Sequence, residues 1–365
     1  MLILNSGPGN YVINRGKRYS YFGGNNYLGL AGHPDVKKAA IEAVEKYGVN
    51  FSASRRTSGT ADIHLELEQA LAKFKGKDDT VVYASGYLGN SILLEALAGK
   101  YTAVFADKAA HSSIRSALNC SACEKYFYEH LNYGDLNLLM NEHPSDAPLV
   151  ITDGVFALSG EIAPLGEIYS VARKHNARLI VDDAHSTGIL GKTGKGTPEY
   201  FGLVADDYIF QTETMSKAIG SYGGFISCSS YVAELIREHS AAYQASTSLP
   251  PAVVAAGLAA VRIIENQPEL RTNLLKKAAY IRSEIIKLGF TTSQSEAPVI
   301  PLIFNDRDTA LSLNRWLDEH GIIVPYMNYP SVHEQYMLRL AVTAIHEMSR
   351  IDELLDRLKK WIPAT

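Results

Sequence analysis

Residues 179–185 read LIVDDAH, an apolar run followed at once by two carboxylates and a histidine. Aliphatic and β-branched residues bounded by polar ones are typical of a buried β-strand. A carboxylate at the end of a strand is usually a solvated cap, so Asp182 alone would indicate little. The segment becomes a candidate site because of a lysine further along the chain.

That lysine is Lys217, in the sequence TMSKAIG at residues 214–220. A lone lysine near a strand end usually lies on the surface, but small residues, hydroxyls and a glycine-rich turn surround this one, which favours a pocket. Partial burial lowers the pKa of a lysine amine and makes it a usable nucleophile. A nearby aspartate such as Asp182 can hold a pyridinium nitrogen protonated. The residues alone are thus compatible with a lysine that holds a pyridine-ring cofactor.

Short apolar runs alternate with longer amphipathic stretches over most of the chain. This alternation predicts an α/β fold with a mostly parallel central sheet and helices on both faces. In such sheets ligands bind at the carboxyl ends of the strands, where the polar motifs of this chain also fall. The predicted strands are residues 80–83, 103–106, 149–152, 179–182, 208–211 and 224–227, with a helix at 168–175.

The character of the sequence changes at the pair Pro250-Pro251. The elements expected after it are helices at 252–265, 274–288 and 349–361 and strands at 299–304 and 322–324. We therefore expect three parts: an N-terminal segment of residues 1–40, a large domain of residues 41–250, and a smaller α+β domain of residues 251–365.

Composition excludes several classes of function. Lys and Arg number 35 against 39 Asp and Glu, and this balance gives no reason to expect nucleic acid or a membrane as partner. No apolar run reaches the ~18 residues of a membrane span, and the N-terminus does not have the apolar region of a secretory signal. Three cysteines, an odd number, fit a reducing cytoplasm without a disulfide framework. Cys120 and Cys123 are interpreted as two small helix residues, and no metal site is expected.

Eight motifs in order resemble the α-oxoamine synthases, and the resemblance covers nearly the whole chain. The motifs are GNNYLGL (24–30), ASGYLGN (84–90), ADKAAHSS (106–113), TDGVFALSGEIAPL (152–165), VDDAHSTGILGKTGKG (181–196), TMSKAIG (214–220), STSLPPA (246–252) and LRLAVTAIH (338–346). These are fold-type I, aspartate aminotransferase-like enzymes that depend on pyridoxal 5'-phosphate (PLP). The family includes 8-amino-7-oxononanoate synthase, 2-amino-3-ketobutyrate CoA ligase, 5-aminolevulinate synthase and serine palmitoyltransferase.

The resemblance implies four catalytic residues. Lys217 is the counterpart of the lysine that holds PLP as a Schiff base and moves the α-proton of the substrate. Asp182 matches the acid paired with the pyridine nitrogen, and His185 matches the partner of the phenolic oxygen. His111, in the sequence AHSS, matches the histidine that stacks on the ring. Aminotransferases of the same fold usually stack an aromatic residue there.

The resemblance also implies a phosphate site. Ser85, Gly86 and Tyr87 match a turn whose backbone amides bind the phosphate, an arrangement suited to a dianion. Thr214 matches a phosphate-binding hydroxyl. Ser331 matches a hydroxyl that the neighbouring subunit supplies, so we expect a homodimer with shared active sites.

The resemblance also implies two residues that bind the substrate. Asn25 resembles the substrate-side asparagine of the family, and Arg339 resembles the arginine that binds the substrate carboxylate. A planar guanidinium suits that role because it donates two parallel hydrogen bonds. An exposed strand residue is the alternative for Arg339.

The chain departs from the family pattern at several positions. Ala157 stands where a serine hydroxyl usually helps to hold the phenolic oxygen, a bond worth about 0.5–1.5 kcal/mol. Glu213 replaces a glycine and is expected to add an acid near Lys217, and His333 replaces a proline. The N-terminal arm is also short. In the family, the arm and the proline-rich segment that contains His333 help to shape the acyl-donor side, so the resemblance supports the cofactor chemistry better than the identity of the thioester.

The implied reaction condenses an amino acid with an acyl thioester, on CoA or on a carrier protein, and releases CO2 to give an α-amino ketone. The sequences STSLPPA and RLAVTAIHEMSRIDELL favour an activity like that of 8-amino-7-oxononanoate synthase. The alternatives are an activity like that of 2-amino-3-ketobutyrate CoA ligase or serine palmitoyltransferase, an aminotransferase of the same fold, and an inactive binding protein.

Overall fold

The computed structural model describes residues 2–203, 208–327 and 336–361. The chain divides into two compact units. The small unit comprises Met1–His33, Ala157–Glu161 and Pro268–Thr365, and the large unit comprises Pro34–Phe156 and Ile162–Gln267. This division differs from the boundaries expected at residues 40 and 250.

Helix packing explains the difference at the second boundary. Helix α10 (Pro251–Asn266), expected to open the C-terminal domain, packs against α1 (Pro34–Tyr47) and α2 (Asp62–Lys75) inside the large unit. Its buried face is apolar along almost its whole length, so it needs neighbours on more than one side.

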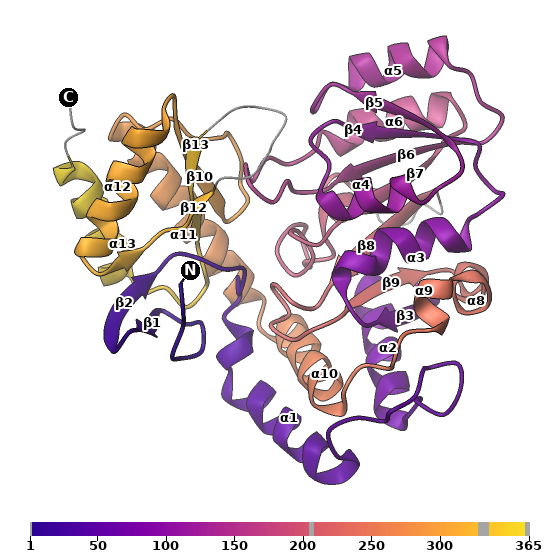
Figure 1. The fold of residues 1–365 in the computed structure, drawn as a ribbon, viewed down its shortest axis with the longest axis horizontal. Coiled ribbons are helices and arrows are strands. Elements are labelled where there is room, and N and C mark those ends of the chain that lie inside the picture. The colour runs from indigo at the N-terminus through magenta and orange to yellow at the C-terminus, as the bar shows by residue number, and fades with distance from the viewer. Residues whose placement is uncertain (1, 204–207, 328–335, 362–365) are drawn as a thin grey trace. The chain divides into compact units, whose positions relative to one another are not determined.

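A seven-stranded sheet forms the centre of the large unit, in the order β3-β9-β8-β7-β6-β4-β5 (Figure 1). The strands are β3 (Asp79–Tyr83), β4 (Ala103–Asp107), β5 (Glu124–Tyr128), β6 (Pro148–Asp153), β7 (Arg178–Asp182), β8 (Ile209–Thr214) and β9 (Gly224–Cys228). Neighbours from β8 to β5 are parallel, and only β9 is antiparallel to both its partners. The predicted mostly parallel α/β sheet is confirmed, with β5 as a strand that the sequence did not predict.

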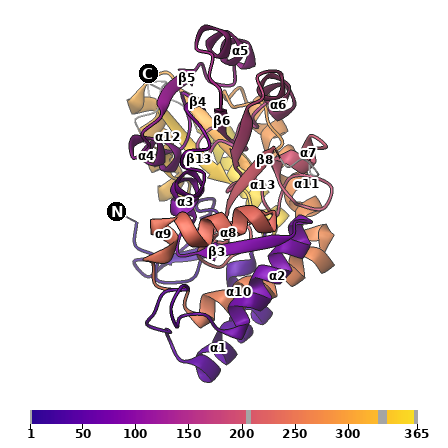
Figure 2. The same cartoon turned by 90° about the vertical axis from the view of Figure 1, so that its right-hand side faces the viewer.

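Two apolar layers cover the two faces of the sheet. Alternate residues along a strand point to opposite faces: Val104 and Ile180 join one cluster, whereas Phe105 and Leu179 join the other. The helices of the first face are α3 (Gly89–Ala96), α4 (Ser112–Asn119), α8 (Ser230–His239) and α9 (Ala241–Gln244). Figure 2 shows α8 and α9 beside α3 and β3. On the second face lie α5 (Tyr133–Glu142) and α6 (Leu165–Lys174) (Figure 1).

The small unit contains two three-stranded sheets. One has the order β10-β13-β12 and the other β1-β2-β11. Its strands are β1 (Tyr11–Asn14), β2 (Lys17–Tyr21), β10 (Val299–Phe304), β11 (Ile322–Ile323), β12 (Tyr326–Met327) and β13 (Tyr336–Ala341), and its helices are α11 (Pro268–Lys287), α12 (Arg307–Glu319) and α13 (Met348–Lys360). The N-terminal residues therefore belong to this unit because β2 pairs with β11, which lies more than 300 positions later.

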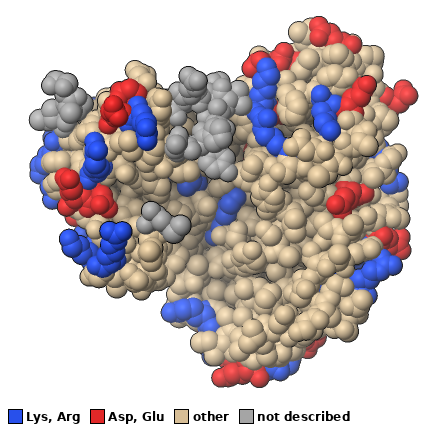
Figure 3. All heavy atoms as spheres, viewed as in Figure 1, with Lys and Arg blue, Asp and Glu red and all other residues tan. Residues whose placement is uncertain are grey.

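Charged side chains of both signs are interspersed over the face of the molecule seen in Figure 3. Among the described residues, no helix has both the length and the apolar character needed to cross a bilayer. The predicted helical position of the CxxC pair is wrong, because α4 ends at Asn119 and both cysteines lie in the turn before β5.

Candidate active site

The carboxyl ends of five strands meet at one edge of the large sheet. Strands β3, β6, β7 and β8 end at Tyr83, Asp153, Asp182 and Thr214, and β4 ends at Asp107. A cavity of about 230 Å³ opens at this edge. Eight predicted site residues line it: Ser85, Gly86, Tyr87, His111, Asp182, His185, Thr214 and Lys217. The structure thus brings them together, and their individual roles stay predictions.

The turn after β3 lies close to the end of β8. Ser85 is extended, and its Oγ accepts a hydrogen bond from the backbone N–H of Tyr87 at 3.4 Å. The 3-10 helix Gly86–Leu88 then leads directly into α3. A Cβ atom at Gly86 would lie 2.6 Å from the side chain of Thr214. Glycine is therefore required here, because it lets the backbone of the turn approach the Thr214 side chain.

Hydrogen bonds fix the carboxylate of Asp182. Its Oδ2 accepts from Asn90 Nδ2 at 2.8 Å and from Ser113 Oγ at 3.4 Å, and its Oδ1 accepts from the backbone of Ala184 at 3.2 Å. Asn90 is held in turn by Thr212, whose hydroxyl donates to Asn90 Oδ1 at 2.9 Å. The carboxylate is buried and cannot rotate without breaking these bonds.

His111 caps the N-terminus of α4. Its Nδ1 accepts from the backbone N–H of Ser113 at 3.2 Å and lies 2.8 Å from Ser113 Oγ. Burial, together with the nearby charge of Lys217, lowers the pKa of His111, although Asp182 acts in the opposite direction. The neutral ring therefore carries its hydrogen on Nε2, which makes that nitrogen a donor.

Asp153 is a site residue to which the sequence analysis gave no role. It lines the same cavity, and its Oδ2 accepts the backbone N–H of His111 at 2.9 Å. Burial, and then the neighbouring Asp182, raise the pKa of Asp153 well above its usual value. Asn90 and Ser113 were not predicted either, although they end the motifs ASGYLGN and ADKAAHSS.

The two predicted substrate residues meet in the small unit. Arg339, on β13, is buried rather than exposed, and its Nη2 donates to Asn25 Oδ1 at 2.9 Å and to the Tyr27 hydroxyl at 3.2 Å. Its Nε donates to the carbonyl of Ala157 at 2.6 Å. Nη1 makes only a longer contact, 3.4 Å, with the carbonyl of Gly24. Of the guanidinium nitrogens, Nη1 is thus the least engaged.

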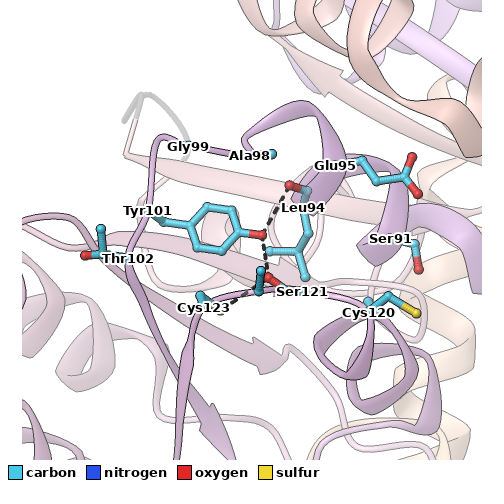
Figure 4. Close-up of a pocket in the computed structure, with 12 residues that line it drawn as sticks. Ser91, Leu94, Glu95, Ala98, Gly99, Tyr101, Thr102, Cys120, Ser121 and Cys123 are labelled. Carbon is cyan, nitrogen blue, oxygen red and sulfur yellow. Dashed lines mark hydrogen bonds between the residues drawn. The ribbon is translucent and has the colours of Figure 1, made fainter.

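Other predicted features fall elsewhere. Ser331 and His333 lie outside the described residues. The contacts of Glu213 do not support the prediction that it adds an acid near Lys217. Its carboxylate contacts Lys75 and Thr187 instead. A larger cavity, about 580 Å³, lies between α3 and the CxxC turn (Figure 4). It has neither the strand ends nor the lysine on which the chemistry depends.

The residues around the smaller cavity fit PLP. Gly86 leaves room for a phosphate beside backbone amides, Asp182 offers a fixed carboxylate to a ring nitrogen, and Lys217 offers an amine. His111 and His185 supply two rings with nitrogen donors or acceptors at the same cavity. The donor set of this cavity matches each polar group of that cofactor.

Comparisons with known proteins agree with this fit. The family model "Aminotransferase class I and II" matches residues 20–358. The 8-amino-7-oxononanoate synthase of Geobacter sulfurreducens is 39% identical over 357 residues, which cover 96% of this chain and 91% of that protein. The corresponding enzyme of Lysinibacillus sphaericus is 36% identical over 360 residues, 98% of this chain and 92% of the relative.

A solved structure extends the comparison to three dimensions. A serine palmitoyltransferase from S. paucimobilis, with PLP bound, superimposes with a TM-score of 0.94 at 30% identity. The match covers 98% of this chain and 91% of that one.

Proposed function

Since this chain belongs to the α-oxoamine synthases of the class I and II aminotransferase family, we propose that it condenses an amino acid with an acyl thioester and releases CO2. The observation that carries the proposal is the single cavity at which Lys217, Asp182, His111 and His185 meet. The fold is the fold-type I transferase fold, and the enzyme is a PLP-dependent acyltransferase.

PLP is the cofactor of this chain. The Ser85–Tyr87 turn and Thr214 would hold its phosphate, Asp182 its pyridine nitrogen and Lys217 its carbonyl carbon. When bound, the cofactor supplies an electron-poor ring that stabilises negative charge at the α-carbon of the amino acid.

Lys217 has two tasks in this proposal. Its amine would anchor the cofactor, and the same nitrogen would move the proton at the substrate α-carbon. Lys217 is only partly buried, so its side chain is accessible from the cavity. The backbone at Lys217 is fixed by the 3.0 Å bond from the Gly220 N–H to the Lys217 carbonyl.

His111 has the donor that the condensation requires. With Nδ1 occupied by the Ser113 N–H, Nε2 presents a hydrogen to the substrate carboxylate or to the oxygen of the thioester. A donor aimed at an oxygen that gains charge lowers the barrier of acyl transfer. Its lowered pKa keeps His111 neutral near pH 7, so it donates without adding a positive charge.

The relatives favour one product. Both relatives compared above are named 8-amino-7-oxononanoate synthase, and we propose the same activity here. A nine-carbon product with its amine on carbon 8 follows from alanine and a seven-carbon dicarboxylic thioester. The structural likeness to serine palmitoyltransferase makes serine with a long-chain thioester the second candidate.

A direct assay distinguishes these candidates. Holoenzyme would be incubated with alanine, glycine or serine and with a seven-carbon dicarboxylic acyl-CoA, a long-chain acyl-CoA or a keto acid, while thiol release, CO2 release and amino-group transfer are measured. We expect both products from alanine and the dicarboxylic thioester. Amino-group transfer to a keto acid without thiol release would instead identify an aminotransferase.

The same proposal includes a homodimer. The large unit exposes apolar side chains on α1 and α2, Ile41, Val44 and Leu65, and the exposed Tyr222 lies in the turn that follows Lys217. A second copy would bury such groups. Mixing Lys217→Ala protein with Ser331→Ala protein tests whether sites are shared, because hybrid dimers would then have an activity that differs from the mean of the two parents.

A further inference from the structure

Lys75 and Glu213 form an ion pair that the mechanism above does not use. Lys75 Nζ lies 2.5 Å from Glu213 Oε1, and both side chains are almost fully buried, with 1% and 0% of their surfaces exposed. Glu213 is also a position at which this chain departs from the family. Replacing a buried pair by apolar residues is often neutral or stabilising, so stability alone does not account for it.

The pair lies on the face of β8 opposite to the side chains of Thr212 and Thr214. Along β8, Thr212 and Thr214 face Asn90 and Gly86, whereas Glu213, between them, faces the opposite side. Any movement of Glu213 therefore moves Thr214, its direct neighbour. Thr214 Oγ1 donates to the Gly223 carbonyl at 3.0 Å, so the turn after Lys217 would move as well.

The pair also holds the segment that carries His185. Thr187 Oγ1 donates to Glu213 Oε1 at 2.6 Å, and Lys75 Nζ donates to the carbonyl of Lys195. These two bonds hold the segment on both sides of its glycine-rich bend. His185 lies two residues before Thr187, at the cavity.

A neighbouring set of bonds reinforces this segment. Asp183 Oδ2 accepts from Gln211 Nε2 at 2.7 Å and from the backbone N–H of Thr197 at 2.9 Å. Gln211 Nε2 also donates to the carbonyl of Lys195 at 3.1 Å. These buried hydrogen bonds, together with the Lys75–Glu213 pair, thus link α2, β8 and the residues between Asp183 and Thr197.

We propose that Lys75 and Glu213 are positioning residues that hold Thr214 and the His185-bearing segment in the arrangement that binds PLP. The inference rests on the cofactor assignment and not on acyl transfer. It requires no contact between the pair and the cofactor, because both side chains lie on the face of β8 opposite to the side chain of Thr214.

The test measures PLP affinity in apoenzyme that is titrated with the cofactor, and the melting temperature of the same apoenzyme. The variants are Glu213→Gln, Lys75→Met and the double variant Lys75→Met/Glu213→Gln. The matched control is Glu68→Gln, which makes the same change in another buried ion pair, Arg55–Glu68. Glu68 lies on α2, as Lys75 does. Lys75→Met leaves a buried carboxylate unpaired and is the variant that can fail to fold, in which case the other two carry the test.

We expect Glu213→Gln to bind PLP roughly tenfold more weakly, the scale at which outer partners of a bound group act. Lys75→Met should be weaker still, and the double variant should recover part of that loss because it leaves no unpaired carboxylate. Glu68→Gln should lower the melting temperature without changing the affinity.

Two outcomes would overturn the inference. One is an affinity within threefold of the parent in Glu213→Gln and in every other variant that folds, whatever their melting temperatures. The other is an equal loss of affinity in Glu68→Gln, which would indicate general loosening. If the parent itself bound no PLP, the cofactor assignment and the proposed function would fail instead.

Discussion

Two polar clusters, one in each unit, are built in different ways. In the large unit, Asp182 and Thr214 end the parallel strands β7 and β8, which hydrogen bonding places side by side, and Lys217 follows β8. In the small unit, Arg339 is held by Asn25, Tyr27 and Ala157, from segments far apart in the sequence. The first cluster is dictated by sheet topology, whereas the second exists only when three separate segments pack. We therefore expect the large unit to determine cofactor binding and the small unit to determine the recognition of substrate.

The largest effect should come from Lys217→Ala. Without the amine, both the anchor of the cofactor and the base at the α-carbon are lost, so turnover should fall below detection. Borohydride treatment of the parent should fix the mass of the cofactor on Lys217 and remove its absorbance band. Reduced cofactor on another lysine would show that the large-unit cluster is not the cofactor site.

His111→Phe should separate two functions within the large unit. Phenylalanine keeps an aromatic ring against the cofactor but has no N–H donor. PLP should stay bound, while the rate of thiol release falls by about 10²–10³, the usual effect of removing one such donor. His111→Ala is the control and should weaken both properties. Condensation at the parent rate in His111→Phe would leave His111 with a stacking role only.

Glu213→Gln should change how stability depends on pH. Burial raises the pKa of the Glu213 carboxyl to about 7 from 4.5, although Lys75 and Thr187 oppose the shift and Asp183 adds to it. The native state then holds this proton more tightly than the unfolded chain. The resulting stability is fully present below pH 4.5 and is lost as pH rises to about 7, by up to ~3 kcal/mol.

Melting curves between pH 5 and 8 test this sign. The groups that face the carboxyl are Lys75 from α2 and, from the residues after β7, Thr187 and Asp183, so all three stay unchanged in the comparison. The parent should lose several degrees relative to Glu213→Gln as pH rises from 5 to 8. A constant difference across that range would mean that Glu213 does not titrate there.

The difference between the polar clusters of the two units also explains which parts of the fold could be predicted from the sequence. The six predicted strands of the large sheet were found, because short apolar runs bounded by polar motifs determine them, and residues predicted to bind the cofactor lie at or after their ends. Strand β13 was missed because Arg339 interrupts its apolar run, and β5 because Glu124 and Lys125 open it. The burial of Lys75 had no local signal, since a lysine near the end of an amphipathic helix is normally solvated.

The smallest effect should come from Arg339→Lys, which tests the small unit alone. Lysine has one nitrogen and cannot replace the bonds of Nε to Ala157 and of Nη2 to Asn25 and Tyr27 at once. The Nη1 donor, the guanidinium nitrogen least engaged within the protein, is lost as well. Each hydrogen bond to a charged group contributes about 1.5–3 kcal/mol, so KM for the amino acid should rise by roughly 10–100-fold. We expect kcat to change less and PLP affinity to remain that of the parent.

Arg282→Lys is the matched control in the same unit. Arg282 is also buried, but its Nη2 donates only to the carbonyls of Ala297 and Val299, at 2.9 Å each. This substitution should lower the melting temperature and leave KM unchanged, because no predicted substrate residue is among its partners. If Arg339→Lys weakened PLP binding as strongly as it raised KM, the two clusters would act as one site. The assignment of cofactor to one unit and substrate recognition to the other would then be wrong.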